Sequence, residues 1–301
     1  MDHDLWRGVV ELYRTDAPHS GRCRGRQPGG PDATAPAVDP PGRRDVASLN
    51  NEGGRRMAQQ RSRFQAESLP ELSIIIPALN EADELDATLH AIARLRGHKE
   101  VIVVDGGSQD MTVEIARQHG ACVMREQGGR GRQLHAGAGL AMADILWFVH
   151  ADTIPPANAV EDIKEALQAP DIVGGCFAVT FAGSTSSARF LTCLFRRLHK
   201  VGLCYGDAAI FVKRDHYITL GGFPPFPIFE DVALLQSLKA LGRLVECPAT
   251  VTTSSRRIER CGLVRTLGLW TAVQVLYWLG VSPYTLGRFY RPVKGQVQTE
   301  P

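Results

Sequence analysis

The spacing of apolar residues divides the chain near residue 69. Residues 1–68 show no regular apolar period, are rich in Arg, Gly, Pro and Asp, and hold no lysine. Such a composition buries too little apolar area to offset the entropy lost on ordering. We therefore predict that residues 1–68 form a disordered N-terminal extension, and we assign it no function. Met57 is an alternative start of the chain.

From residue 72 onward, short apolar runs alternate with segments of helical period. The β-branched run 72–76 predicts a strand, and the spacing of Leu85, Leu89 and Ile92 predicts a helix. The same order recurs, with strands over 101–104, 121–124 and 145–149 and helices over 110–116 and 133–143. Alternating strands and helices are typical of a parallel, doubly wound sheet, so the predicted fold class is α/β.

The second half of the chain is less regular. The predicted elements are helices over 163–167 and 231–241 and extended segments over 173–181 and 208–212. The longest apolar stretch, 263–286, is interrupted by polar residues, glycine and proline, so it falls short of the ~20 clean residues that span a bilayer. It fits either a packed C-terminal helix or a helix at a membrane interface. We place one catalytic domain at 69–292 and a flexible tail at 293–301.

Charge and cysteine content narrow the partners and the compartment. The net charge of +2 provides no global field that would recruit nucleic acid, so no nucleic-acid partner is predicted. Seven cysteines occur singly, without the spacing of a zinc site or a disulfide framework, and we expect reduced thiols. With no export signal at the N-terminus, the predicted location is cytoplasmic, with peripheral contact at the inner face of the plasma membrane as a second interpretation.

Polar clusters follow three of the predicted strands: Asn80-Glu81, Asp105-Gly106-Gly107-Ser108 and His150-Ala151-Asp152. In open α/β sheets, ligands bind beyond the carboxyl ends of the strands. A carboxylate at such an end suits a ribose or a base edge, and adjacent glycines let a ligand approach the backbone. The alternative for Asp105-Gly106-Gly107 is an ordinary turn.

Other charged residues suit a diphosphate. Asp152 can hold a divalent cation against it, although Pro155-Pro156 also makes Asp152 a candidate helix cap. Arg130 and Arg132 lie in a predicted glycine-rich loop that suits phosphate, or else in a solvated turn. Because the chain lacks a G-x-G-x-x-G after its first strand and a P-loop lysine, a dehydrogenase and a P-loop ATPase are disfavoured.

The second half adds three further candidates. Glu230 and Asp231 follow the rigid apolar segment 223–229, which would place a carboxylate in partly desolvated surroundings and make it a useful base. Asp207 precedes an apolar strand and is otherwise a turn residue. The pair Arg256-Arg257 lies in a predicted polar loop and is otherwise a solvated face.

Four ordered segments together, 73–81, 103–110, 150–152 and 229–232, resemble the family 2 glycosyltransferases. More narrowly, the chain is similar to the subgroup labelled rSAM/selenodomain-associated transferase 2, over residues 70–292. The resemblance implies a GT-A fold, a Rossmann-like nucleotide-diphospho-sugar transferase with a central, mostly parallel sheet flanked by helices. It also implies a nucleotide-diphosphate sugar as donor, a divalent metal, Mn²⁺ or Mg²⁺, and inversion of the anomeric carbon.

The resemblance also assigns residues. Those implied to bind the donor are Pro77, Asn80, Glu81, Asp105 and Asp152, to which the residue pattern adds Gly106, Arg130 and Arg132. Those implied at the acceptor and diphosphate are Asp207, Arg256 and Arg257, and the E-D motif supplies Glu230 with Asp231 as the general base. His150 stands where the family has the first acid of its D-x-D metal motif. Imidazole ligates Mn²⁺ but suits Mg²⁺ poorly. The prediction of a metal site therefore depends mainly on Asp152 as the ligand.

The expected reaction is attack of an acceptor hydroxyl on the sugar C1, with Asp231 taking the proton. The acceptor is a small molecule or a lipid, and a carotenoid-type carboxylate acceptor would need no base. Two alternatives stay open. A nucleotidyltransferase would open with a Gly- and Arg-rich loop after its first strand, whereas 77–81 holds no glycine. A catalytically inactive nucleotide-sugar-binding module is motivated by His150.

Overall fold

The computed structural model describes residues 69–200 and 208–289, without the side chains of 199, 200 and 257. The predicted extension 1–68, the predicted tail 293–301 and Asp207 therefore lie outside the described residues. Every described residue belongs to one compact unit, which begins at Ala58.

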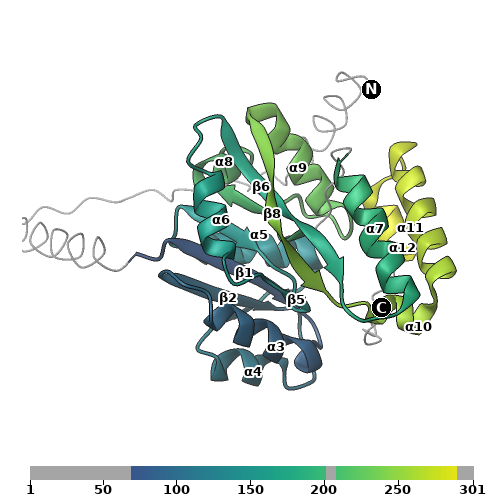
Figure 1. Ribbon diagram of the computed structural model, residues 1–301, viewed down its shortest axis with the longest axis horizontal. Coiled ribbons are helices and arrows are strands. Elements are labelled where there is room, and N and C mark those ends of the chain that lie inside the picture. Colours follow the sequence, from purple (N-terminus) through teal and green to yellow (C-terminus); the bar gives the residue numbers. More distant parts are fainter. Residues whose placement is uncertain (1–68, 201–207, 290–301) are drawn as a thin grey trace, which may run out of the picture. The chain divides into compact units, whose positions relative to one another are not determined.

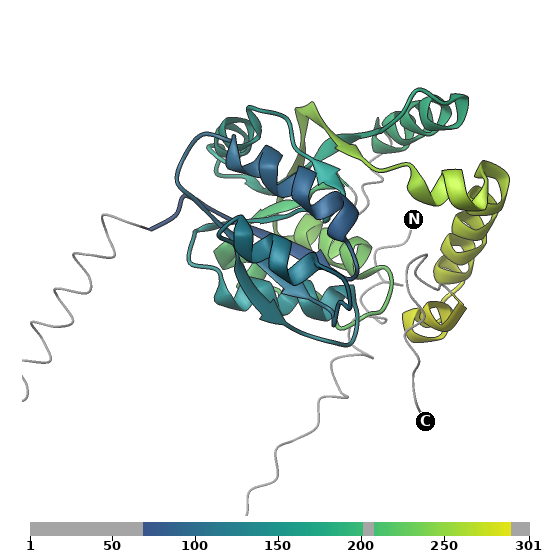
Figure 2. The same ribbon diagram turned by 90° about the horizontal axis from the view of Figure 1, so that it is seen from below.

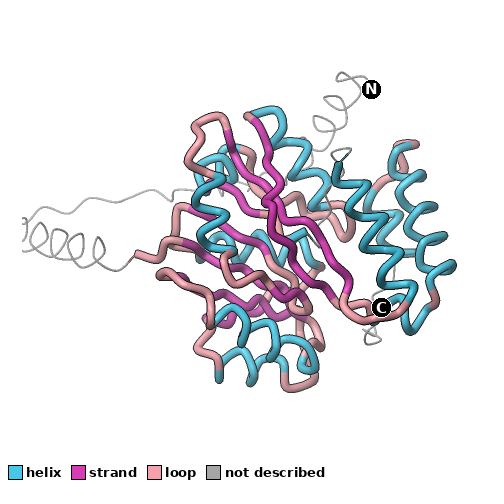
Figure 3. Tube along the Cα trace, in the orientation of Figure 1, coloured by secondary structure: helices cyan, strands magenta, loops and turns pink. Residues whose placement is uncertain are grey.

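The strands of the described residues form one sheet in the order β3-β2-β1-β4-β7-β6-β8-β5, seen as a continuous layer in Figures 1 and 3. The strands are β1 (Leu72–Ala78), β2 (Lys99–Asp105), β3 (Cys122–Arg125), β4 (Ile145–Phe148), β5 (Thr153–Ile154), β6 (Ile172–Phe181), β7 (Phe211–Lys213) and β8 (Arg243–Thr253).

Helices surround this sheet. They are α3 (Ala82–Ala93), α4 (Thr112–Gln118), α5 (Arg130–Leu140), α6 (Ala159–Ala166), α7 (Ser186–Lys200), α8 (Arg214–Thr219), α9 (Glu230–Leu241), α10 (Arg256–Cys261), α11 (Leu263–Trp278) and α12 (Pro283–Phe289). Helix α5 packs on β1 and β2, α7 packs on β6, and α6 and α9 pack on β8. Figure 2 shows α10, α11 and α12 following one another to one side of the sheet. No helix of the described residues is long and apolar enough to cross a membrane.

The two halves of the sheet differ in strand direction. Strand β1 runs parallel to β2 and β4, and β2 runs parallel to β3, as the alternating pattern predicts. Strand β7 is antiparallel to β4 and β6, whereas β6 and β8 are parallel and β5 is antiparallel to β8. The carboxyl ends of β1, β2 and β4 therefore meet at one edge, where the first three polar clusters lie.

The core lies on both faces of the central strands. All seven residues of β1 are buried, which explains its continuous apolar run rather than an alternating one. Trp147 is fully buried, packs its ring 5.7 Å from that of Phe177, and donates its indole N–H to the carbonyl of Ala209 at 3.1 Å. Burying such rings stabilises the sheet, and the indole hydrogen bond removes the cost of an unpaired donor.

Three local expectations need correction. Helix α5 begins at Arg130, so Arg130 and Arg132 lie on its first turn and not in a loop. Arg256 and Arg257 lie on the short helix α10 and not in a loop. The expectation that all cysteines are reduced is wrong for Cys176, which is disulfide-bonded. A disulfide forms where two thiols approach each other in space, and the positions of isolated cysteines along the sequence do not predict this approach.

Candidate active site

The loops after β1 and β2 are locked together by hydrogen bonds. The backbone N–H of Asn80 donates to the Ser108 hydroxyl at 2.9 Å, and the Asn80 side-chain oxygen accepts the backbone N–H of Gln109 at 2.8 Å. Asn80 holds a left-handed backbone with φ of 53°, which asparagine tolerates better than most residues. The two polar clusters at these strand ends thus form one structure.

Asp105 organises the turn that follows it. Its side chain is nearly buried and accepts the backbone N–H groups of Gly107 and Ser108, each at 3.0 Å. Gly107 has φ of 104°, a conformation that strongly favours glycine. The turn interpretation of Asp105-Gly106-Gly107 therefore describes the local structure. Contact of Asp105 with a ribose or base stays a prediction, and an ionised carboxylate has acceptor capacity left for it.

Gln133 is a positioning residue that the sequence analysis missed. It is buried on α5, and its side-chain amide donates to the carbonyls of Ala78 at 3.1 Å and Val104 at 2.8 Å. A Cβ at Gly106 would lie 3.0 Å from this amide nitrogen, so the strand ends and α5 fit tightly. The sequence feature that could have revealed Gln133 is its place as a polar residue on the predicted buried face of an amphipathic helix.

Arg256 joins segments that are far apart in the sequence. Its guanidinium donates to Glu81 Oε2 at 3.0 Å and lies 2.7 Å from Glu84 Oε1 and 3.4 Å from Asp152 Oδ2. These contacts link the end of β1, the first turn of α3 and the loop after β4 to α10. Asp152 is not a helix cap, because α6 begins at Ala159 with Asn158 as its N-cap.

The charge of Arg256 is reinforced by this setting. Partial burial by itself would lower its pKa, but the hydrogen bond to Glu81 and the charges of Glu81, Glu84 and Asp152 outweigh burial and raise the pKa. One guanidinium nitrogen, Nη1, is buried without a hydrogen-bond partner. A partly buried cation with an unused donor is suited to an anionic group such as a phosphate.

Arg130 joins the other half of the site. It forms an ion pair with Glu230 at the start of α9, and its Nη1 lies 3.5 Å from His150 Nε2. Glu230 is fully buried. Burial raises the pKa of Glu230, the Arg130 charge opposes this shift, and the neighbouring Asp231 adds to it. Because His150 precedes Asp152 by two residues, this pair lies beside the Arg256 cluster.

The segment before Glu230 holds its backbone in an uncommon conformation. Phe229 caps α9 with φ of 65°, and its ring stacks on Tyr277 of α11 with centroids 4.3 Å apart. Strained backbone of this kind persists only where surrounding packing holds it, and it is frequent at functional sites. The next two residues, Glu230 and Asp231, are 0% and 6% exposed, which confirms the desolvation that the apolar approach predicts.

Few side chains of the site could ligate a metal ion. Among the described residues, no group of three or more His, Cys, Asp and Glu side chains could hold an ion. Asp152 and His150 supply one carboxylate and one imidazole. This set fits a divalent ion such as Mn²⁺ that completes its shell with substrate phosphates and water, and it does not fit a closed structural site.

The structure thus brings together most of the residues singled out from the sequence. The members of the assembled site are Asn80, Glu81, Asp105, Gly106, Arg130, His150, Asp152, Glu230, Asp231 and Arg256. Pro77 pairs in register with Val104 on the same edge. Arg132 instead pairs with Glu126 at 2.9 Å. Asp207 and the side chain of Arg257 lie outside the described part of the chain.

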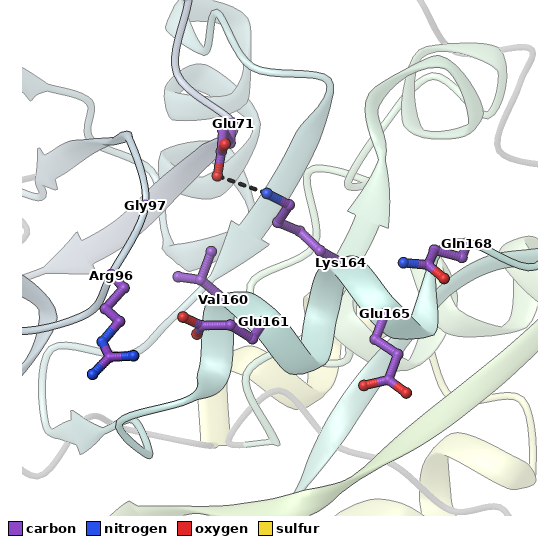
Figure 4. A pocket seen from close by; sticks show the side chains of 8 residues that line it. All are labelled: Glu71, Arg96, Gly97, Val160, Glu161, Lys164, Glu165 and Gln168. Carbon is purple, nitrogen blue, oxygen red and sulfur yellow. Dashed lines mark hydrogen bonds and ion pairs between the residues drawn. The ribbon is translucent and has the colours of Figure 1, made fainter.

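A separate cavity of about 540 Å³ lies at the opposite, amino edge of β1 (Figure 4). Glu71 and Lys164 form an ion pair of 2.9 Å across it, and Glu161 and Arg96 line it. Its charges are mixed and mostly solvated, and it contains none of the residues that assemble at the carboxyl edge.

Comparison with known proteins shows similarity to glycosyltransferases. Residues 73–216 match the family model described as Glycosyl transferase family 2. Glycosyltransferase AglE of Haloferax volcanii is 30% identical over 173 residues, which cover 52% of this chain and 57% of that protein. The 4,4'-diaponeurosporenoate glycosyltransferase of Staphylococcus haemolyticus is 27% identical over 180 residues, covering 52% of this chain and 48% of that protein. The chain thus spans about half the length of the curated relatives it matches.

One solved structure bears on the fold. Mannosyltransferase PcManGT from Pyrobaculum calidifontis, solved in complex with GDP-Man and Mn²⁺, has a TM-score of 0.50 and 18% identity, covering 75% of this chain and 74% of that chain. At this identity the likeness concerns the fold alone, and it confirms the GT-A class.

Proposed function

We propose that this chain, whose residues 73–216 match the family 2 glycosyltransferase model, transfers a sugar from a nucleotide-diphosphate sugar to an acceptor, with inversion of the anomeric carbon. The observation that carries the proposal is the convergence of three motif segments, 73–81, 150–152 and 229–232, on two arginines. The fourth segment, 103–110, is hydrogen-bonded to the first through Asn80. Arg256 contacts Glu81 and Asp152, and Arg130 contacts His150 and Glu230. The donor would lie between these two centres, along the carboxyl edge of β1, β2 and β4.

The two acidic residues of α9 take different roles in this proposal. Glu230 is fully buried and paired with Arg130, so it positions the first turn of α9 and does not meet the acceptor. Asp231 retains some exposure, and one of its oxygens accepts the backbone N–H of Val232 at 2.8 Å. Asp231 is therefore the general base for the acceptor hydroxyl.

The reaction then runs as a single displacement. The acceptor oxygen forms a bond to C1 of the sugar while the bond from C1 to the diphosphate oxygen breaks, and the acceptor proton passes to Asp231. Negative charge develops on the departing diphosphate, and Arg256 with its buried, unpartnered Nη1 stabilises it. A divalent ion, when bound, would be held by Asp152 and His150 and would neutralise the same charge.

The acceptor belongs to the proposal as well. The relative named as a diaponeurosporenoate glycosyltransferase supports a lipid-like acceptor of the carotenoid-acid type. A carboxylate acceptor is already ionised and needs no base. Replacement of Asp231 therefore distinguishes an acceptor hydroxyl from an acceptor carboxylate.

The test is turnover of Asp231→Asn against a panel of UDP- and GDP-sugars, with and without Mn²⁺. General-base catalysis contributes about 10²–10⁴-fold, so nucleoside-diphosphate release should fall by about that factor with a hydroxyl acceptor. Thermal stabilisation by the donor should persist in this variant. Donor at about 100 times its dissociation constant adds roughly 2.7 kcal/mol to the free energy of unfolding, whether or not the catalytic base is present.

Other outcomes separate the alternatives. Release of pyrophosphate from a nucleoside triphosphate and a sugar 1-phosphate, without release of a nucleoside diphosphate from the nucleotide-diphosphate sugars, would identify a nucleotidyltransferase. Stabilisation by a donor without turnover in the wild type would identify an inactive binding module. Unchanged turnover of a hydroxyl acceptor in Asp231→Asn would remove Asp231 as the base.

A further inference from the structure

Helix α11 directs much of its apolar surface outward. Leu269, Ala272, Leu276 and Leu279 recur at intervals of three or four residues and are all exposed. The exposed fraction reaches 75% at Leu279, and other exposed apolar side chains on α11 and α12 are Val264, Val275, Trp278, Tyr284 and Phe289. Single exposed apolar residues are normal, but a contiguous patch marks an interaction surface. The packed-core interpretation of this helix therefore accounts only for its inner side.

Helix α7 adds basic residues beside this patch. It packs against α11 through the rings of Phe195 and Trp270, whose centroids are 6.1 Å apart. Its outward face carries Arg189, Arg196 and Arg197, which line an open cavity of about 510 Å³. Among the described residues, no carboxylate forms an ion pair with these arginines.

The helices α7, α10, α11 and α12 carry mostly positive charge. Glu259 is the single acidic residue in the sequences of α7, α10, α11 and α12. Arg260, Arg265 and Arg288 are exposed on the last three of these helices. Exposed apolar residues combined with unpaired arginines suit the headgroup region of an anionic bilayer. A second copy of the chain fits less well, because a two-fold contact would bring the same basic residues together.

We propose that the exposed faces of α7, α11 and α12, here called the basic-apolar surface, bind an anionic lipid bilayer. The inner side of α11 and α12 packs on the segment that leads into the site. Tyr277 stacks on Phe229, Tyr284 packs on Phe226, and a Cβ at Gly287 would lie 2.5 Å from Pro227. Bilayer binding would therefore place the acceptor side of the site at the membrane surface. This link to a lipid acceptor rests on the proposed function, whereas the surface itself does not.

The test is flotation of the full chain with vesicles, without any donor. We expect binding to vesicles of phosphatidylcholine with phosphatidylglycerol, weak binding to phosphatidylcholine alone, and loss of binding at high salt. Arg196→Gln with Arg197→Gln should weaken binding about fivefold for each arginine, the factor that corresponds to roughly 1 kcal/mol per basic side chain near an anionic leaflet. Leu279→Ser and Val264→Ser, both at highly exposed positions, should each weaken binding by about tenfold.

Matched controls lie elsewhere on the surface. Ile218→Ser on α8 removes a side chain that is 62% exposed, and Arg117→Gln on α4 removes an exposed arginine. Neither should alter vesicle binding. Asp231→Asn should bind vesicles like the wild type, so failure of the surface and failure of the proposed function are distinguishable.

Three results would overturn the proposal. The first is no binding to anionic vesicles by a folded wild-type chain. The second is binding that the α7 and α11 variants leave unchanged. The third is a dimer in light scattering that Leu279→Ser and Val264→Ser dissociate, without vesicle binding, because the surface would then be covered by a second copy.

Discussion

Arg130 and Arg256 both bridge distant segments of the site through ion pairs with carboxylates, but the carboxylates differ in their exposure to solvent. Arg130 pairs with Glu230, whose side chain is fully buried. Arg256 meets Glu81, Glu84 and Asp152, whose side chains are 23%, 28% and 27% exposed. A buried charge that loses its partner is costly, whereas partly exposed charges are screened by water and salt. The difference indicates that Arg130 fixes the structure of the site and that Arg256 serves a ligand.

Removing Arg130 should have the largest effect on stability. Arg130→Ala leaves Glu230 buried without its cation, which typically costs about 3–5 kcal/mol. The measurement is the free energy of unfolding in urea. Arg132→Ala is the matched control, because Arg132 lies on the same turn of α5 and pairs with Glu126 at the surface, where such pairs contribute about 0–1 kcal/mol. Equal losses in the two variants would contradict the role of Arg130.

The pH dependence of this loss has a defined sign. The pKa of Glu230 is already raised from its ordinary value of 4.5, chiefly by burial, and without Arg130 it should rise further. A carboxyl group whose pKa is raised on folding contributes its stability at low pH and loses it as the pH rises through the folded-state pKa. The deficit of Arg130→Ala should therefore be small below the ordinary carboxyl range and grow as the pH rises. Glu230→Gln in the same background should remove this growth.

Packing around Arg130 provides a second, smaller test. A Cβ at Gly131 would lie 2.8 Å from the Pro224 carbonyl and 3.1 Å from Cβ of Glu230, so Gly131→Ala should cost about 1–3 kcal/mol and displace the Glu230 segment. On the same helix, nothing lies within 4 Å of a Cβ at Gly139. Gly139→Ala should instead stabilise the fold by about 0.5–1 kcal/mol, because alanine favours helix. A loss at Gly139, or no loss at Gly131, would show that α5 packs differently.

Removing Arg256 should have a much smaller effect on stability than removing Arg130, and a clear effect on donor binding. We expect Arg256→Ala to lower the free energy of unfolding by about 1 kcal/mol, and less at high salt, since its partners are partly solvated. The affinity for nucleotide-diphosphate sugars should fall in titrations of the same protein. A loss of several kcal/mol that salt does not change would make Arg256 a structural clamp like Arg130 and erase the contrast between them.

Much of the site was predictable because its residues occupy recognisable places in local patterns. The clusters at Asn80, Asp105 and Asp152 each follow an apolar strand, and parallel strands bring their carboxyl ends to one edge. The burial of Glu230 follows from the apolar segment before it. The partners of Arg256 were not predictable, because Arg256 and Glu81 are 175 positions apart. Gln133 was missed because its two acceptors are backbone carbonyls, which have no sequence signature.

The sequence by itself determined the α/β class, the strand-end placement of the polar clusters and the resemblance to a glycosyltransferase family. These features depend on local periodicity and short-range order, which the chain encodes directly. Only the tertiary structure decided that Arg130 and Arg256 hold the clusters together, that Cys176 is disulfide-bonded, and that α11 turns apolar residues outward. Those features depend on which side chains, far apart in the sequence, come into contact in the folded chain. The local spacing of residues does not specify these contacts.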